Sequence, residues 1–266
     1  MKDMYSYSID VEQHEKFYQA TIDAYKRVFA RLGVGEDTFV TFASGGAFTQ
    51  FSHEFQTICE TGEDKIYINR EMNIAINEEV LNEETLKELG VTWDELEEVV
   101  TAEVGNIFNF GTAKCEEMGL VFQNKEGKMV PVHLGSYGIG ITRMMGVIVD
   151  KMSDEKGIAW PESVSPYDLH VVTIGDGQEV VDMVSDVEAG MGDDVLVDDR
   201  TIGPGQKLGD ADLMGITKRA VISEKSIAAG GIELTDRKTG TSEIVSLEEL
   251  RNWYESLREE TNHNQA

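Results

Sequence analysis

One glycine-rich segment constrains the possible folds of this chain more than any other segment does. It covers residues 130–152 and reads VPVHLGSYGIGITRMMGVIVDKM: a short apolar run, closely spaced glycines, an arginine and an apolar repeat of helical spacing. The glycine spacing fails the dinucleotide pattern G-x-G-x-x-G, and the Lys-Ser/Thr pair of a P-loop is absent. The segment therefore predicts a strand, a glycine corner and a helix that begins near Arg143, and it argues against a Rossmann turn.

Length and composition indicate a globular protein. The chain has 266 residues, enough for one large core or two ordinary ones, and 41% of them are hydrophobic. No run reaches the roughly 18 apolar residues of a membrane span, and the first residues hold no apolar signal region. The two cysteines, Cys59 and Cys115, form no C-x-x-C pair, so neither a disulfide framework nor a cysteine zinc site is expected. We expect a cytoplasmic protein with no membrane partner.

The charge of the chain is unusually negative. Fifty acidic residues stand against 23 basic ones, which gives a formal net charge of −27 that repels nucleic acid on average. Part of the excess falls on sequence typical of solvated helix faces, such as residues 77–100. A solvated acidic surface and a salt-adapted source both account for this charge, and the sequence leaves the two open.

The segments before residue 160 predict strands joined by few helices. Residues 10–32 have apolar residues at helical spacing and a following glycine, and the next stretch reads as strands interrupted by a Ser-Gly-Gly corner at residues 44–46. An acidic helical pair is expected at about residues 78–100. The two prolines of WPESVSPYD indicate a linker, so we place a domain boundary near Trp160, between residues 1–160 and 161–266.

Residues 161–266 predict a small α/β domain. Strand-like runs (LHVVTI, DVLVDD, KRAVIS, GIELTD and EIVSL) alternate with an amphipathic helix, QEVVDMVSDVEAGMG. The final helix is expected to begin with a capping box formed by Ser246 and Glu249. The polar loop DDRTIGPGQKLGDADLMGI is the one part that a hydrophobic core does not explain.

Several motifs together resemble one known family. GSYGIGITRMMG resembles motif 3 of the class II aminoacyl-tRNA synthetases, and GGAFTQFSHEFQT, GEDKIYI and AEVGNIFNFGT are similar to the active-site strands of the prolyl-tRNA synthetases. VLVDDR and GPGQKLGDADLMGI resemble the anticodon-binding domain of the same family. The resemblance implies an α+β antiparallel-sheet catalytic core, partial and within residues 1–160, followed by an α/β anticodon-binding domain.

The resemblance also has departures. The opening MKDMYSY resembles the MKDAYSF that closes the second strand of motif 2, so motif 1, the motif 2 arginine and the Thr-x-Glu loop have no counterpart in these 266 residues. Residues 70–100 replace the family's large editing insertion. We therefore expect a C-terminal portion or one piece of a split enzyme, with little activity on its own. A homodimer and an N-terminal fragment chain are the protein partners that the family implies.

The resemblance places an ATP site on the glycine-rich segment. Arg143 would neutralise the γ-phosphate, since a guanidinium offers a planar fork to phosphate oxygens, and Gly138 and Gly140 form the corner beneath it. Glu103 would contact ATP or its Mg2+, and Asn106 would lie beside the ribose. A surface arginine and a strand-end acid are the plain alternatives for Arg143 and Glu103.

The same resemblance implies sites for proline and for tRNA-Pro. The residues expected at the proline pocket are Ser52, His53, Glu54, Phe108, Gly135 and Ser136. An anionic side chain among them could meet the cationic imino group of proline; edge positions and plain core are the alternatives. Asp199, Arg200 and Lys207 are expected to contact the anticodon, or else to anchor their own loop through a salt bridge.

Three classes of function stay open from the sequence alone. The first is a prolyl-tRNA synthetase that activates proline with ATP and transfers it to tRNA-Pro. The second is a non-catalytic synthetase-like protein that binds tRNA, proline or a partner chain. The third is an unrelated nucleotide-binding enzyme, and the failed G-x-G-x-x-G spacing and the ordered set of motifs weigh against it.

Overall fold

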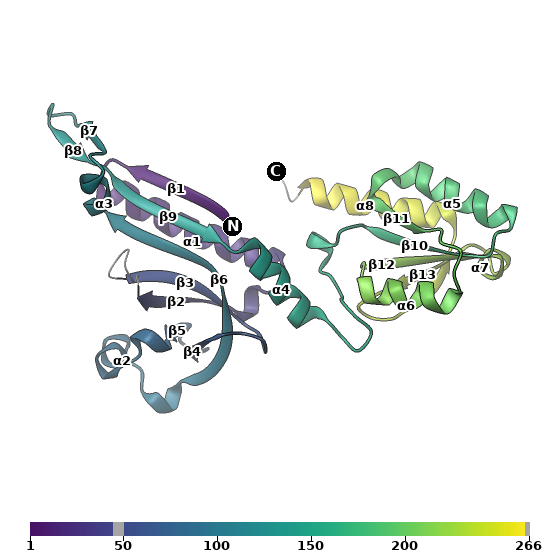
Figure 1. The fold of residues 1–266 in the computed structure, drawn as a ribbon, viewed down its shortest axis with the longest axis horizontal. Coiled ribbons are helices and arrows are strands. Elements are labelled where there is room, and N and C mark those ends of the chain that lie inside the picture. The colour runs from purple at the N-terminus through teal and green to yellow at the C-terminus, as the bar shows by residue number, and fades with distance from the viewer. Residues whose placement is uncertain (45–50, 264–266) are drawn as a thin grey trace. The chain divides into compact units, whose positions relative to one another are not determined.

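The computed structural model describes residues 1–44 and 51–263, and Figure 1 shows the course of the chain. It divides into two compact units, Met1–Lys151 and Met152–Ala266. Gly45 and Gly46 of the expected Ser-Gly-Gly corner lie outside the described residues. No helix in the described ranges is long and apolar enough to cross a membrane.

The N-terminal unit is built on a sheet of seven strands within the described residues. In sheet order these are β1 (Lys2–Ser8), β9 (His133–Ile139), β6 (Glu97–Gly111), β3 (Phe51–Ile58), β2 (Thr38–Ser44), β5 (Ile74–Asn77) and β4 (Asp64–Asn69). Neighbouring strands are antiparallel except β2 and β5, and β4 also pairs with the first residues of β6. The expected α+β antiparallel core is confirmed.

One long helix, α1 (Val11–Arg31), packs against β1 and β9 of this sheet (Figure 1). Asp10 starts the helix because its carboxylate accepts a hydrogen bond from the Gln13 amide. Tyr25 and Phe29 come one helical turn apart on its buried face, and their rings lie 5.1 and 5.3 Å from the ring of Phe55 on β3. These aromatic contacts fix the helix to one face of the sheet and leave the opposite face available for a site.

Strand β6 carries an irregularity that matters for that second face. Its register against β3 shifts at the point where Phe55 pairs with Gly105 while Gln56 pairs with Glu103. A β-bulge of this kind adds one residue to one strand and so changes which side chains share a face. Asn106 and Glu103 are three residues apart, an odd spacing that an unbroken strand would place on opposite faces, yet their side chains are hydrogen-bonded.

The acidic helical pair expected at residues 78–100 is wrong in extent. Only α2 (Glu83–Leu89) is an α-helix there, begun by the side chain of Asn82 and ended by Gly90 in the left-handed region. Glu97 and the residues after it are strand, and Glu98 bonds to Lys65 of β4 at 2.8 Å. Pairing with β4 outweighs the helical propensity of the glutamates, because propensity is a weak local preference.

The remaining elements of the N-terminal unit follow β6. They are α3 (Ala113–Glu117), β7 (Val121–Gln123), β8 (Met129–Pro131) and α4 (Ile141–Met152). Strand β9 runs directly into α4 through Gly140, as the glycine-rich segment predicts. The strand, corner and helix expected around Arg143 are therefore confirmed.

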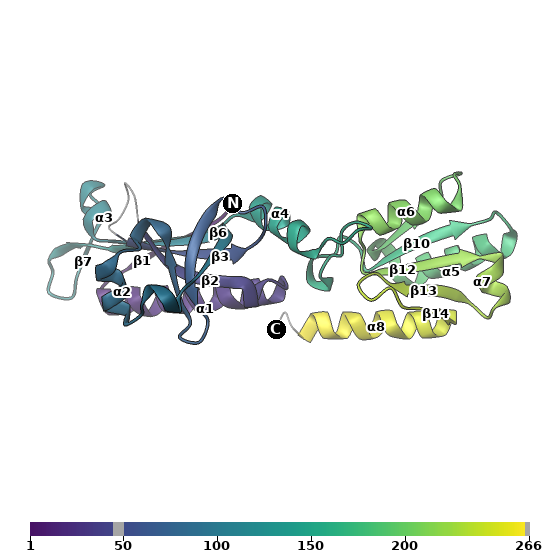
Figure 2. The ribbon, with the colours of Figure 1, turned by 90° about the horizontal axis from the view of Figure 1, so that it is seen from below.

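The C-terminal unit is a mixed sheet covered on both faces, as Figure 2 shows. Its strands are, in order, β11 (Val195–Asp198), β10 (Leu169–Ile174), β12 (Lys218–Ser223), β13 (Ile232–Asp236) and β14 (Ser242–Val245). Its helices are α5 (Gln178–Met191), α6 (Pro204–Met214), α7 (Glu224–Ala228) and α8 (Leu247–His263). Helices α5 and α8 pack on Leu169 and Val171, while α6 packs on Val172. The predicted α/β domain is confirmed, and so is the capping box of Ser246 and Glu249.

The segment that joins the units is fastened to the C-terminal one. Arg237, only 6% exposed, donates two hydrogen bonds of 2.7 Å to the carboxylate of Asp154. The Ile158 amide bonds to the Leu213 carbonyl, and the indole N–H of Trp160 bonds to a neighbouring carbonyl of the same unit. The compact units divide at Lys151, and the expected domain limit near Trp160 stays a prediction that excision of the domain can test.

Candidate functional site

Two rows of side chains cross the sheet face opposite α1. Glu54 on β3 pairs with Asn106 on β6, which pairs in turn with Gly138 on β9. In the next row, Ser52 pairs with Phe108 and Phe108 with Ser136. Directly opposed residues of a sheet point to the same side, so these rows bring three distant segments of the chain onto one surface.

Arg143 stands at one end of this surface, in the first turn of α4. Its guanidinium donates to the Glu103 carbonyl oxygen at 3.2 Å and forms an ion pair of 2.7 Å with Glu63. A positive charge at a helix N-terminus opposes the helix dipole and requires a nearby anion. Glu63 supplies that anion from within the chain, and a bound phosphate is a further anion that the same group could hold.

The Glu103 carboxylate lies beside the same arginine and is held by the Asn106 amide, with 2.8 Å between nitrogen and oxygen. Burial raises the pKa of Glu103, while the Asn106 bond and the charge of Arg143 oppose that rise. The arrangement gives one positioned carboxylate next to one guanidinium. It suits a ligand that carries both anionic groups and a hard cation.

A side chain would be crowded at the glycine corner beneath these groups. A Cβ on Gly138 would lie 3.0 Å from the Asn106 side-chain oxygen, and one on Gly140 would lie 3.3 Å from Cβ of Arg143. Both distances are tighter than ordinary contacts between carbon and its neighbours. The glycines therefore let strand β9 and the turn into α4 pass close to the polar groups of the site.

Glu54 is the second acidic group of the surface, and its carboxylate is partly enclosed. Gln56 and Asn77 each donate a side-chain N–H to its Oε2 at 3.0 Å. Burial raises the pKa of Glu54, and the negative charges of Glu103 and Asp64 raise it further. The supporting side chains Gln56, Asn77 and Thr101 were missed from the sequence, although the spacing Glu54-x-Gln56 on a strand was the available signal.

The structure does not bring all the expected proline-site residues together. His53 points to the helix side of the sheet, where its Nδ1 lies 2.8 Å from the Tyr18 hydroxyl. Burial lowers the pKa of His53. Gly135 also faces that side, because a Cβ there would collide with the Tyr137 hydroxyl and meet Ser6 Oγ at 2.9 Å. Ser52, Glu54, Phe108 and Ser136 share the site face, whereas His53 and Gly135 support the sheet from behind.

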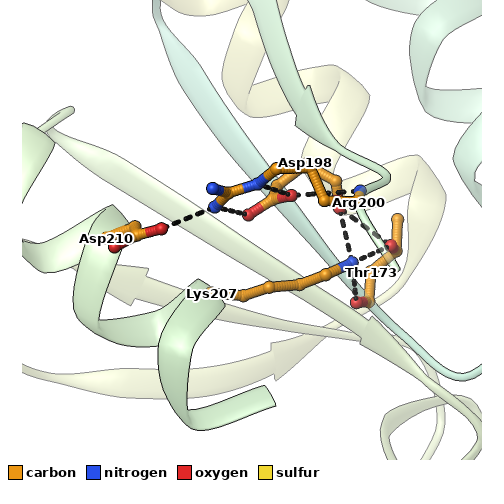
Figure 3. A network of polar contacts seen from close by, with 5 residues as sticks. All are labelled: Thr173, Asp198, Arg200, Lys207 and Asp210. Atoms are coloured by element: carbon orange, nitrogen blue, oxygen red, sulfur yellow. Dashed lines mark hydrogen bonds and ion pairs between the residues drawn. The ribbon is translucent and has the colours of Figure 1, made fainter. Parts of the chain in front are cut away.

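In the C-terminal unit, Lys207 is enclosed by its own domain (Figure 3). Its ammonium donates to the Thr173 hydroxyl, the Thr173 carbonyl and the Asp198 carbonyl, each at 2.9 Å. An ammonium has three donors, so all of them are used, and the side chain is 4% exposed. Contact between this ammonium and an RNA would require these bonds to break.

Arg200 has the opposite character, since it is about half exposed. Its guanidinium makes a two-bond contact with the Asp198 carboxylate, at 2.9 and 2.7 Å, and a further bond of 2.7 Å to Asp210 (Figure 3). These hydrogen bonds lower the pKa of Asp198 to about 2. Asp199 is exposed in the same loop. The loop thus presents a hydrogen-bonded Arg200 and an exposed Asp199, while the buried Lys207 holds the loop in place.

Sequence comparison assigns both units to known families. Residues 1–152 match the tRNA synthetase class II core domain (G, H, P, S and T), and residues 168–257 match the anticodon binding domain. The first match covers more than half of the chain, and it agrees with the antiparallel sheet, the glycine corner and the arginine of α4 described above. The chain belongs to the class II tRNA synthetase core family.

Two relatives with high coverage of this chain are proline–tRNA ligases. The chain is 34% identical over 281 residues to the proline–tRNA ligase of Agrobacterium fabrum, covering 95% of this chain and 64% of the relative. It is 32% identical over 279 residues to that of Caulobacter vibrioides, covering 94% and 62%. The chain therefore spans a little under two thirds of the length of these relatives.

A solved structure shares the fold. The Giardia lamblia prolyl-tRNA synthetase in complex with prolyl-adenylate superposes with a TM-score of 0.71 at 15% sequence identity. The match covers 94% of this chain and 46% of the other. At this identity the likeness concerns the fold, and it extends through nearly all of the chain.

Proposed function

We propose that this chain forms the ATP- and proline-binding part and the anticodon-binding part of a prolyl-tRNA synthetase. The observation that carries the proposal is the surface across β3, β6 and β9, where Glu54, Glu103 and Asn106 lie on one face and Arg143 stands at its end. The likeness to proline–tRNA ligases over 94–95% of the chain supports the same substrates.

The proposed reaction needs charge stabilisation and positioning rather than a covalent protein group. A carboxylate oxygen of proline attacks the α-phosphorus of ATP, the bond from that phosphorus to the β-phosphate oxygen breaks, and pyrophosphate leaves. Arg143 would neutralise the γ-phosphate, and Glu54 would pair with the cationic imino group of proline. A hydroxyl of the terminal ribose of tRNA-Pro then attacks the carbonyl carbon of the adenylate and loses its proton, the bond from that carbon to the phosphate oxygen breaks, and AMP leaves.

Magnesium fits this site as a companion of ATP. No group of three or more potential ligands among the described residues could hold a metal by itself. A single carboxylate together with substrate phosphates and water is, however, a common way for proteins to bind Mg2+. Glu103 would be that carboxylate, and Mg2+ would supply charge neutralisation on the phosphates.

We also propose that residues 161–266 contact the anticodon of tRNA-Pro. Arg200 and Asp199 are the exposed groups for base contacts, and Lys207 supports them from inside by holding the loop. A homodimer and a chain that supplies motifs 1 and 2 are the proposed protein partners. Cytoplasm is the proposed compartment, in keeping with two buried free thiols.

Proline-dependent exchange of pyrophosphate into ATP tests the proposal. The chain should be assayed alone and together with any polypeptide encoded directly upstream, with proline compared against alanine and glycine. We expect little exchange by the chain alone. With the upstream polypeptide present, we expect exchange that depends on proline and that Arg143→Ala reduces by about 10²-fold or more, since removal of one such charge contact costs that much. Arg27→Ala, at an exposed site on α1, is the matched control. Exchange that is indifferent to the amino acid would refute the proposal.

A further inference from the structure

Two amide side chains converge on one oxygen of Glu54. The Gln56 and Asn77 side-chain nitrogens both donate to Oε2, each at 3.0 Å, and they come from different strands, β3 and β5. Among the residues that the structure describes, no donor is bonded to the other oxygen, Oε1. The two oxygens of this carboxylate are therefore not equivalent.

The oxygen of each amide accepts a hydrogen bond from a group other than Glu54. The Thr101 hydroxyl donates to Gln56 Oε1 at 2.9 Å and holds that oxygen in place, while the nitrogen of the same amide donates to the carboxylates of Glu54 and Asp64. A flipped Gln56 would aim its oxygen at two negative groups. Gln56 and Thr101 are both fully buried, so an arrangement that left one of their polar atoms without a hydrogen-bond partner would be costly.

Asn77 is oriented in the same manner by the backbone. Its Oδ1 accepts the Glu79 amide hydrogen at 3.1 Å and caps the short 3₁₀ turn that follows β5. Its Nδ2 is therefore left to donate to Glu54. Two independent devices, a buried hydroxyl and a helical cap, thus fix the donors that hold Glu54 Oε2.

We propose that Thr101, Gln56 and Asn77 are positioning residues that hold Glu54 so that Oε1 faces the cationic amine of the amino-acid substrate. The proposal rests on the proposed function for the identity of that substrate, and on the hydrogen bonds above for the support itself. None of the three needs to touch the substrate. They fix the rotamer of Glu54 and determine which of its carboxylate oxygens faces the substrate.

The charges around Glu54 explain why such a support is needed. Asp64 on β4 and Glu103 on β6 are the acidic groups whose charges act on it. Without donors on Oε2, repulsion from these two carboxylates would turn the Glu54 side chain away from them. Gln56 relieves part of this repulsion, because its single NH2 group bridges Glu54 and Asp64, at 3.0 Å from each.

A matched pair of variants at Thr101 tests the proposal in the full chain. Thr101→Val keeps the shape but removes the hydroxyl that orients Gln56, whereas Thr101→Ser keeps the hydroxyl. We expect Thr101→Val to weaken L-proline binding about tenfold with ATP binding unchanged, and Thr101→Ser to bind both ligands as the unaltered chain does. Asn77→Asp, which retains the cap but turns the donor into a second carboxylate, should weaken proline binding at least as much. Calorimetric titration with each ligand separately gives these affinities.

A second measurement separates this proposal from the proposed function. The side-chain NH2 signals of Gln56 in ¹⁵N-resolved NMR spectra should exchange slowly in the unaltered chain and in Thr101→Ser, and should lose that protection in Thr101→Val. If the unaltered chain binds no proline, the proposed function fails. The NH2 signals still show whether Thr101 holds Gln56 in place. The positioning role of Thr101 is refuted if the Gln56 NH2 hydrogens still exchange slowly in Thr101→Val. It is also refuted if this variant weakens ATP and proline binding equally.

Discussion

The guanidinium of Arg143 lies 2.7 Å from the Glu63 carboxylate, so the arginine proposed to bind a nucleotide phosphate is paired with a group of its own chain. Both side chains are open to solvent, at 44% and 68% exposure. Exposed ion pairs of this kind contribute about 0–1 kcal/mol. A phosphate can replace Glu63 at small cost, and until then the glutamate compensates the charge of Arg143 at the start of α4.

Neutralising Glu63 should therefore tighten ATP binding. In Glu63→Gln, the arginine loses its competing anion, and we expect the dissociation constant for ATP to fall about 2- to 5-fold, as the energy of an exposed pair allows. Calorimetric titration with ATP measures this change. Glu60→Gln removes an equal charge from the same loop and serves as the control. An unchanged affinity, or equal tightening in both variants, would show that Glu63 does not compete for Arg143.

Local patterns predicted much of this architecture. The strand, corner and helix around Arg143, the long helix after Asp10 and the cap at Ser246 are all set by nearby residues, and all three are present. Local signals failed between residues 78 and 100, where glutamates typical of helices pair as a strand with β4. Strand pairing depends on partners far along the chain, which a helical pattern does not report.

The candidate site could be predicted only in part, for a related reason. A motif names neighbouring residues such as Ser52, His53 and Glu54 together, yet a strand alternates its side chains between two faces. His53 consequently bonds to Tyr18 behind the sheet. The burial of Lys207 depends on Thr173 and Asp198, which reach it only through the tertiary fold.

Added salt should stabilise this protein. A net charge of −27 on 266 residues makes the folded chain repel itself, and salt screens that repulsion. We expect the melting temperature to rise by several degrees between about 0.1 M and 2 M KCl, where the Debye length falls well below 10 Å. Thermal melts followed by circular dichroism measure the shift. A melting temperature that falls as KCl rises would mean that the acidic groups are already compensated by specific ion pairs.

Anticodon binding should respond to the charges that flank Arg200. Asp210 accepts a hydrogen bond from Arg200 and reduces its attraction for RNA. Arg200→Ala should weaken binding of the tRNA-Pro anticodon stem-loop by about 1–3 kcal/mol, and Asp210→Asn should strengthen it slightly. Fluorescence anisotropy at several salt concentrations measures both, with an unrelated stem-loop as the control. Equal loss for the two stem-loops would assign Arg200 to general phosphate attraction rather than to base recognition.

The Asp198 carboxylate should make the C-terminal unit sensitive to acid. Hydrogen bonds from Arg200 lower the pKa of this carboxylate to about 2 in the folded state, below the roughly 3.9 of an unfolded aspartate. The contribution of this carboxylate to the free energy of unfolding is therefore complete above about pH 4. It is lost as the pH falls towards 2, a change of about 2 kcal/mol. Urea unfolding across this range should show that loss, and Asp198→Asn should remove it. Asp199→Asn, in the same loop but exposed, should leave the loss in place.

The ion pair between Asp154 and Arg237 should decide where the C-terminal domain can be cut. A fragment that begins at Pro161 lacks Asp154, which would leave the nearly buried guanidinium of Arg237 without its two short bonds. A fragment that begins at Met152 keeps them, together with the backbone bond from Ile158 to Leu213. Both fragments should be soluble, but the longer one should be more stable by about 1–3 kcal/mol, the cost of a buried donor that loses its acceptor.

Urea unfolding of the two fragments measures that difference, and one substitution identifies its source. Asp154→Asn in the longer fragment keeps the backbone bonds of the joining segment but weakens the contact with Arg237. If the ion pair is responsible, this variant should lose a large part of the added stability, because charge-assisted bonds are roughly twice as strong as neutral ones. If it loses none, the backbone contacts of residues 158–160 hold the segment, and the charge of Asp154 has no part in it. Equal stability of the two fragments would instead place the functional domain limit at the prolines near Trp160.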